Sequence, residues 1–299
     1  MVKNIIIKNS VIAIGNFDGV HKGHQEIFKN GKKIANKKKK NFGVLTFSPL
    51  PSEFFKKENS SSRITEDAIK INLLKQNKVD FFYICKFNKQ FSLMTAENFI
   101  KKIIVKKLQA SLVIVGKDFR FGNKRKGNIS LLKNYGKIYN FKVMDMKILK
   151  DKNVKISSTK IRSEIKKGNF EIVRNLLGRF WSIKDKVIRG RKVGRSLGIR
   201  TANIEIKNNI TPKIGVYAVK MIVDRFNYKG VANFGFAPTF ARNKLVLEIN
   251  LFKKIKSIYG KKVEVFFIKR IRSEKKFKNK NLLIKQIKKD IYKAKQILK

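Results

Sequence analysis

Two histidines three positions apart are the sharpest chemical feature of this sequence. His21 and His24 lie in the segment GNFDGVHKGHQ, residues 15–25, and the chain has no other histidine. The apolar run Val11–Ile14 precedes this segment and an amphipathic run follows it, which predicts a turn from a buried strand into a helix. Glycines let such a turn approach a ligand closely, and the free amides of a helix start bind phosphate. We therefore interpret the segment as a phosphate site in which both imidazoles reach one anion.

Two other interpretations of the histidine pair compete with this one. The two residues could be ordinary surface histidines, or they could be metal ligands. A zinc site needs further His or Cys ligands, and the sequence offers none near this segment. A chain rich in lysine that places its only two histidines in a glycine-rich turn favours phosphate chemistry.

The composition excludes several classes of protein. A chain of 299 residues that is 42% hydrophobic predicts about two domains with real cores and excludes disorder throughout. Its single cysteine, Cys85, excludes a disulfide-stapled secreted scaffold. Lys3 and Lys8 interrupt the apolar start, so we expect no signal peptide, and no uncharged apolar run reaches the ~18 residues of a membrane span. We expect a cytoplasmic protein with no membrane partner.

The formal net charge of +52 would attract nucleic acids, anionic lipids and phosphorylated small molecules alike. The basic residues are 58 lysines and only 14 arginines, and the lysines are spread along the chain. A dedicated nucleic-acid surface would favour arginine and concentrate its charge. We therefore interpret most of the excess as solvated surface and expect no nucleic-acid partner.

The first half of the chain alternates short apolar runs with amphipathic runs. This order predicts a parallel sheet covered by helices on both faces, with ligands at the carboxyl ends of the strands. The expected strands are Val11–Ile14, Val44–Phe47, Phe81–Ile84 and Leu112–Val115. The expected helices are Gly23–Ala35, Glu66–Gln76, Ala96–Lys107 and Ile129–Tyr139.

The pattern changes after a helical run, Phe170–Leu177, that stops at Gly178. Strand-like runs then follow one another with few helices between them until the last stretch, Asn281–Lys299, which favours an antiparallel barrel or sandwich closed by a terminal helix. The expected strands are Trp181–Arg189, Gly215–Val223, Tyr228–Asn233, Leu245–Phe252 and Val263–Ile268. We predict an α/β fold with a Rossmann-like first domain over residues 1–180 and an antiparallel β-barrel domain over 181–299.

Several motifs occur in an order that resembles one family, the bacterial bifunctional riboflavin kinase/FAD synthetases. The longer form GNFDGVHKGHQ resembles the nucleotidyltransferase signature of that family. Further matching segments are Thr46–Pro49, Gly116–Gly122, Ile156–Arg162, Gly194–Asn203, Gly215–Tyr217, Asn233–Phe240 and Leu247–Glu248. The resemblance runs through nearly the whole chain.

The resemblance implies that the first domain transfers the adenylyl group of ATP to FMN, which forms FAD and releases pyrophosphate. His21 and His24 would be catalytic. The implied nucleotide-binding residues are Gly15, Phe17, Gly23, Ser158, Thr159 and Arg162, and the implied flavin-binding residues are Asp118 and Phe119. From the sequence alone, the Ser-Thr pair could equally be a plain helix cap beside a surface arginine, and Phe119 could belong to the core.

For the second domain the resemblance implies phosphorylation of riboflavin to FMN by ATP with Mg²⁺. Thr201 and Asn203 supply oxygen ligands of the kind that magnesium accepts, and Glu248 would act as general base toward the riboflavin hydroxyl. Gly194 and Gly198 would belong to the loop over the ATP phosphates. An outward-facing strand carboxylate is the simpler alternative for Glu248.

Three positions depart from the family pattern. Arg200 stands where proline is usual, Lys192 where glycine is expected, and Leu50 where the family has histidine between two prolines. Leucine donates no hydrogen bond to phosphate, so we expect weakened but retained adenylyl transfer. Three alternatives stay open: an FAD synthetase with an impaired kinase half, an enzyme of the same nucleotidyltransferase fold that accepts another phosphorylated acceptor, and a basic nucleic-acid-binding protein on the same scaffold.

Overall fold

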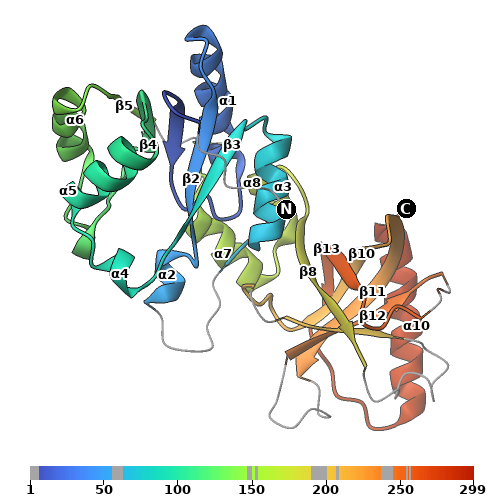
Figure 1. Cartoon of the computed structure of the whole chain (residues 1–299). Coiled ribbons are helices and arrows are strands. Elements are labelled where there is room, and N and C mark those ends of the chain that lie inside the picture. Colours follow the sequence, from blue (N-terminus) through green and yellow to red (C-terminus); the bar gives the residue numbers. More distant parts are fainter. Residues whose placement is uncertain are drawn as a thin grey trace. The chain divides into compact units, whose positions relative to one another are not determined.

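The computed structural model describes residues 7–55, 63–146, 150–151, 154–189, 201–206, 209–236, 245–253, 255 and 257–299. Contacts within the chain divide it into two compact units. The first unit comprises residues 1–63 and 67–158, and the second comprises residues 64–66 and 159–299. Figure 1 traces the elements of each unit along the chain.

A five-stranded parallel sheet forms the centre of the first unit, in the order β3-β2-β1-β4-β5. Its strands are β1 (Val11–Ile14), β2 (Phe42–Ser48), β3 (Phe81–Lys86), β4 (Leu112–Gly116) and β5 (Lys142–Met146). A two-stranded hairpin follows, with β6 (Lys150–Asp151) and β7 (Val154–Lys155). All four residues of β1 are buried, as expected for a central strand with both faces covered.

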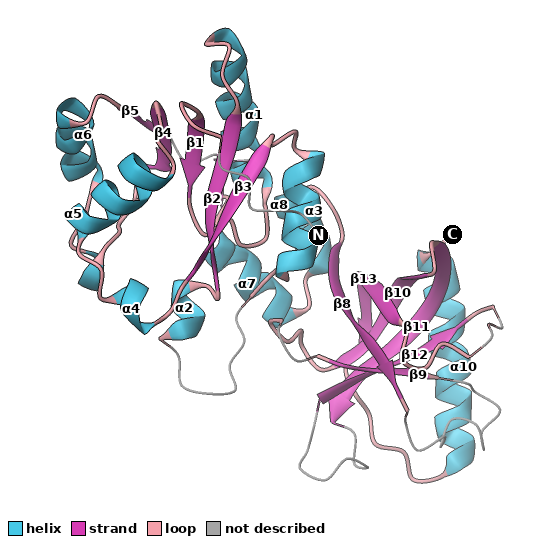
Figure 2. Cartoon of the chain, in the orientation of Figure 1, coloured by secondary structure: helices cyan, strands magenta, loops and turns pink. Residues whose placement is uncertain are grey.

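Helices cover both faces of this sheet (Figure 2). The side chains of β1 alternate between two apolar clusters, one formed with α1 and α3 and the other with α5, η1 and α6. The helices are α1 (Lys22–Lys37), α2 (Pro51–Phe54), α3 (Asp67–Gln76), α4 (Lys89–Ser92), α5 (Ala96–Asn98), the π-helix η1 (Phe99–Lys107), the 3₁₀ turn η2 (Asn123–Arg125) and α6 (Ile129–Ile138).

A closed six-stranded antiparallel barrel dominates the second unit, in the order β10-β11-β12-β9-β8-β13. Its strands are β8 (Trp181–Ile188), β9 (Ala202–Glu205), β10 (Gly215–Val223), β11 (Phe226–Phe236), β12 (Leu245–Leu251) and β13 (Lys262–Arg272). Its helices are α7 (Ser158–Lys167), α8 (Phe170–Leu177) and α10 (Lys280–Ile297).

Aromatic packing holds α8 to the barrel. The ring of Phe170 stacks on Trp181 and on Phe267, with centroid distances of 5.6 and 5.1 Å. The indole of Trp181 is 1% exposed, and its Nε1 donates a hydrogen bond of 2.8 Å to the carbonyl of Ile64. On another part of the barrel, α10 packs against β10 and β11 through Ala294 (Figure 1).

The predicted fold class is confirmed: a Rossmann-like parallel sheet is followed by an antiparallel barrel with a terminal helix. Four strands were missed: β5, β9 and the two short hairpin strands β6 and β7. The edge strand β5 mixes lysine and aspartate with its apolar residues, and β9 has only four residues, so neither forms the apolar run by which the other strands were recognised. The helix expected over Ala96–Lys107 is a short α-helix that continues as a π-helix.

Candidate active sites

The turn between β1 and α1 has an unusual backbone. Phe17 and Val20 have positive φ angles of 44° and 41°, and Gly19 has one of 85°. Bulky and β-branched residues rarely adopt this conformation, so the surrounding structure must hold it. Phe17 and Val20 are both buried, and their side chains anchor the turn to the apolar cluster under α1.

The two histidines lie face to face at the start of α1. Their ring centroids are 3.5 Å apart and their planes differ by 19°. His21 is the N-cap of the helix, and its Nδ1 accepts a hydrogen bond of 3.3 Å from the backbone N–H of His24. A neutral imidazole that accepts at Nδ1 carries its proton on Nε2 and donates from that side. This arrangement suits a pair of donors beside the positive end of a helix.

Two neighbours fix the orientation of these rings. Phe17 places its ring edge-on to His24 at a centroid distance of 5.2 Å. Gly23 lies under the imidazole of His21, and a Cβ atom at this position would stand 3.2 Å from that ring. The predicted site residues Phe17, Gly23 and both histidines therefore form one contact group.

A second loop leaves the sheet next to this turn. Strands β1 and β4 are parallel neighbours, and the chain continues from β1 to β2 on one side and from β4 to β5 on the other. This is the switch point at which open α/β sheets bind ligands. Gly116 ends β4, and a Cβ atom there would meet nothing within 4 Å, so the loop borders open space.

The predicted flavin residues belong to the loop after β4. Asp118 is exposed, and the backbone N–H of Phe119 donates to the carbonyl of Gly116 at 3.0 Å, which closes a turn. The ring of Phe119 stacks on Phe121 at 5.3 Å and packs at the rim of an apolar cluster. Phe119 is thus partly buried, with its neighbour Phe121 in the core.

Helix α7 begins at Ser158, the first of the three predicted pyrophosphate residues. Its Oγ donates a hydrogen bond of 2.9 Å to the carbonyl of Asp18, which joins the start of α7 to the turn after β1. Thr159 is exposed and Arg162 is half-buried, one turn further along α7.

In the barrel, three polar residues occupy one cross-strand row. Asn203 of β9 is the register partner of Glu248 of β12, and Glu248 is the register partner of Asn233 of β11. Register partners point to the same face of a sheet, so the three side chains line one strip of the barrel. The predicted pair Asn203 and Glu248 is therefore brought together, and Asn233 joins it.

Glu248 is exposed, yet the protein around its carboxylate displaces enough water to raise its pKa above the usual value. A raised pKa makes a carboxylate a stronger base. Thr201 precedes β9 and is half-buried, and Asn203 is 6% exposed. The phosphate-loop residues Gly194 and Gly198, and the departures Lys192 and Arg200, lie outside the described residues.

Comparison with known proteins finds a family match for each half of the chain. The family model described as FAD synthetase matches residues 3–160, and the model described as riboflavin kinase matches residues 177–298. A bifunctional riboflavin kinase/FMN adenylyltransferase of Buchnera aphidicola from Schizaphis graminum is 46% identical and covers 96% of this chain and 93% of its own. The chain belongs to the bifunctional riboflavin kinase/FMN adenylyltransferase family.

Two further comparisons also cover nearly the whole chain. The Escherichia coli K12 bifunctional riboflavin kinase/FMN adenylyltransferase is 34% identical over 94% of this chain and 90% of its own. A crystal structure described as a macrolide-efflux protein from Streptococcus pneumoniae is 32% identical, with a TM-score of 0.85 over 96% of this chain and 94% of that one. The family predicted from the ordered motifs is confirmed. Within the described part of the chain, no helix has the length and apolar character to cross a membrane.

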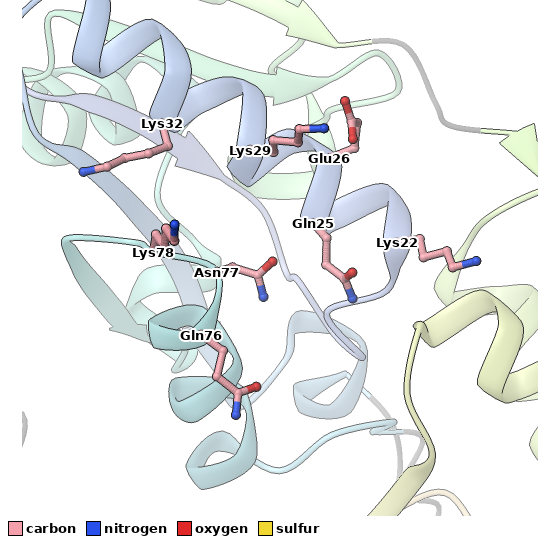
Figure 3. A pocket seen from close by; sticks show the side chains of 8 residues that line it. All are labelled: Lys22, Gln25, Glu26, Lys29, Lys32, Gln76, Asn77 and Lys78. Carbon is pink, nitrogen blue, oxygen red and sulfur yellow. The ribbon is translucent and has the colours of Figure 1, made fainter.

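A basic cavity of about 550 Å³ lies beside the nucleotidyltransferase turn of this family member (Figure 3). Four lysines, one glutamate and three amide side chains line it: Lys22, Gln25, Glu26, Lys29, Lys32, Gln76, Asn77 and Lys78. These residues come from α1 and from the end of α3, and neither histidine is among them. The Nε2 of Gln25 donates to the carbonyl of Val20 at 2.8 Å, so one wall of the cavity also braces the turn.

Two features of the first site were not predicted from the sequence. Leu50, at the position where the family has histidine, is 1% exposed and belongs to the interior. Lys70 is also 1% exposed, beneath the turn after β1. The sequence did not single out Lys70, because it stands within a helical pattern, where lysine normally faces water.

Proposed function

We propose that this chain phosphorylates riboflavin to FMN in its barrel domain and adenylylates FMN to FAD in its parallel-sheet domain, with ATP as the second substrate of both reactions. The observation that carries the proposal is the presence of both family models, in order, on one chain. The His21–His24 pair beside the sheet switch point and the Asn203–Glu248 row on the barrel support a separate site for each reaction.

In the adenylyl transfer, a phosphate oxygen of FMN attacks the α-phosphorus of ATP, and the bond to pyrophosphate breaks. The protein has little covalent work here beyond aligning the phosphates and neutralising charge. We assign His21 and His24 as donors to the α-phosphate, within a nucleotide site that includes Gly15, Phe17 and Gly23. The stacked imidazoles and their place at the start of α1 support this role.

Other residues complete this site in the proposal. Ser158, Thr159 and Arg162 bind the departing pyrophosphate, which suits a helix start with an arginine one turn later. Asp118 and Phe119 contact the flavin from the loop after β4. The position of that loop at the switch point, beside open space at Gly116, supports the assignment.

In the kinase reaction, the 5′-hydroxyl of riboflavin attacks the γ-phosphorus of ATP and ADP leaves. Glu248 accepts the hydroxyl proton as general base, which its raised pKa favours. Gly194 and Gly198 belong to the phosphate loop of the same site.

Thr201 and Asn203 would hold Mg²⁺ on the barrel. Among the described residues no group of three His, Cys, Asp or Glu side chains forms a metal site. In the proposal a hydroxyl, an amide and the ATP phosphates supply the oxygens. Magnesium accepts that donor set, and when bound it neutralises phosphate charge.

We further propose that residues 1–180 form the adenylyltransferase domain and residues 181–299 the kinase domain, and that the enzyme acts in the cytoplasm. Within the second unit, α8 contacts the barrel strands β8 and β13. A lone buried thiol, Cys85, whose pKa burial raises to about 11, suits a reducing compartment.

One experiment tests the proposal directly. Purified protein is incubated with MgATP and either riboflavin or FMN, and the flavins are separated by chromatography. We expect FAD from both mixtures. FAD from FMN alone would support the alternative with an impaired kinase half. No conversion of either flavin would overturn the proposal and make salt-dependent polynucleotide binding the next measurement.

A further inference from the structure

A buried lysine lies beneath the candidate adenylyltransferase site. Lys70 is on α3, and its side chain is 1% exposed. Lysine is almost never fully buried unless its charge is compensated, because leaving water costs an ammonium group far more than it costs an apolar side chain. In a chain with 58 lysines available for the surface, burial of this one demands a local reason.

The ammonium group of Lys70 faces the beginning of the turn after β1. Its Nζ lies 3.4 Å from the carbonyl oxygen of Asn16 and 3.5 Å from the Oγ1 of Thr46. Thr46 itself donates to the same Asn16 carbonyl at 3.0 Å. Two side chains from different elements, α3 and β2, therefore converge on one backbone oxygen of the turn.

Carboxylates balance the charge of this lysine. Asp67, one turn earlier on α3, approaches the Nζ to 3.5 Å, and the charge of Asp18 also favours the ammonium form. Burial nevertheless lowers the pKa of Lys70, because desolvation outweighs these attractions and Arg63 adds repulsion. The ion pair thus offsets only part of the cost of burial, as is usual for buried charges.

The backbone that Lys70 contacts is the one that needs support. Asn16 immediately precedes Phe17, the first residue of the turn with a positive φ, and the strained stretch ends at Val20, next to the N-cap His21. The strained stretch itself has a second support, since Ser158 donates to the carbonyl of Asp18. Side chains that over-determine a strained conformation are a usual device for holding a ligand-binding turn in place.

We propose that Lys70 is a positioning residue for adenylyl transfer, which with Thr46 pins the Asn16 carbonyl and so holds the histidine-bearing turn in its reactive conformation. This inference rests on the proposed function of the first domain. Lys70 acts through the backbone and contacts no substrate. Displacement of reacting groups by about 1 Å costs on the order of 100-fold in rate, so its loss should be measurable in the chemical step.

The test compares Lys70→Met with Lys75→Met in the full-length chain. Methionine fills similar volume without charge, and Asp67 keeps its 3.0 Å ion pair with Arg63. Lys75 lies on the same helix and is exposed, which makes it the matched control. The kinase reaction of the same molecules is the internal control for concentration and folding of the second domain.

We expect Lys70→Met to lower kcat for FAD formation from FMN by about 10- to 100-fold, with kinase activity and the Lys75→Met control at wild-type values. If Lys70 only stabilised the fold, Lys70→Met would lower the unfolding temperature and leave kcat unchanged when it is measured well below that temperature. Wild-type kcat in folded Lys70→Met would therefore overturn the proposal. Failure of the wild-type chain itself to convert FMN would instead overturn the proposed function.

If Lys70→Met fails to fold, a second pair of variants tests whether the Asn16 carbonyl is pinned. Thr46→Val removes the hydroxyl that donates to Asn16, and Thr46→Ser keeps it. We expect Thr46→Val to lower the kcat for FAD formation and Thr46→Ser to restore it. Equal kcat values for the valine and serine variants would contradict the pinning of this carbonyl.

Discussion

His21 has two separable tasks in the proposed site, and substitution can divide them. Its Nδ1 caps α1 by accepting from the His24 amide, and its Nε2 is the proposed donor to the α-phosphate. His21→Ala removes both functions. His21→Asn removes the imidazole but keeps a side-chain oxygen, and asparagine is among the best N-cap residues.

The size of each effect follows from the structure. A lost N-cap costs about 0.5–2 kcal/mol, and the long 3.3 Å hydrogen bond places His21 toward the lower end. For a domain of this size, ~1 kcal/mol lowers Tm by about 2–4 °C. Loss of one preorganised donor to a developing charge costs about 100- to 1,000-fold in kcat.

The assay measures FAD formation from FMN, FMN formation from riboflavin, and thermal unfolding for the wild type and both variants. We expect His21→Ala and His21→Asn to lose adenylyl transfer to the same extent, with riboflavin phosphorylation intact in both. Only His21→Ala should show the lower Tm. Adenylyl transfer at the wild-type rate in His21→Asn would refute the donor role, and loss of both reactions in a folded variant would refute the separation of the two sites.

Three further predictions address the second site, the metal and the core. Glu248→Gln should abolish FMN formation while FAD formation from added FMN continues. In the wild type, kinase activity should rise with pH through a midpoint above the ordinary 4.5 of a glutamate, because the protein around the carboxylate displaces water and so raises the pKa of Glu248, and only the ionised form accepts a proton. Chelation of Mg²⁺ with EDTA should stop both reactions, and added Mg²⁺ should restore them; full activity in EDTA would refute metal dependence. Gly31→Ala should destabilise the first domain by about 1–3 kcal/mol, since a Cβ atom would stand 2.3 Å from the buried ring of Phe42; an unchanged Tm in thermal unfolding would show that Phe42 moves aside.

Much of the candidate site and of the elements that carry it could be predicted from local sequence. The strand Val11–Ile14, the glycine-bearing turn and the helix after it are recognisable from apolar runs and spacing, because each depends on interactions between residues close in the chain. The same holds for β10 and α8, whose bounds match the prediction residue for residue. Weakly apolar strands such as β5 were not predicted. Pairing with β4 stabilises β5, and no local sequence pattern reveals this pairing.

The sequence by itself determined the two fold classes, the family and the identity of the candidate catalytic side chains. These properties depend on residue types, on their spacing and on the order of motifs along the chain. Only the tertiary structure decided that Asn233 joins the row of Asn203 and Glu248, that Leu50 is interior, and that Lys70 is buried beneath the turn. The physical reason is that strand register and burial come from contacts between distant segments, which a local pattern of apolar and polar residues does not encode.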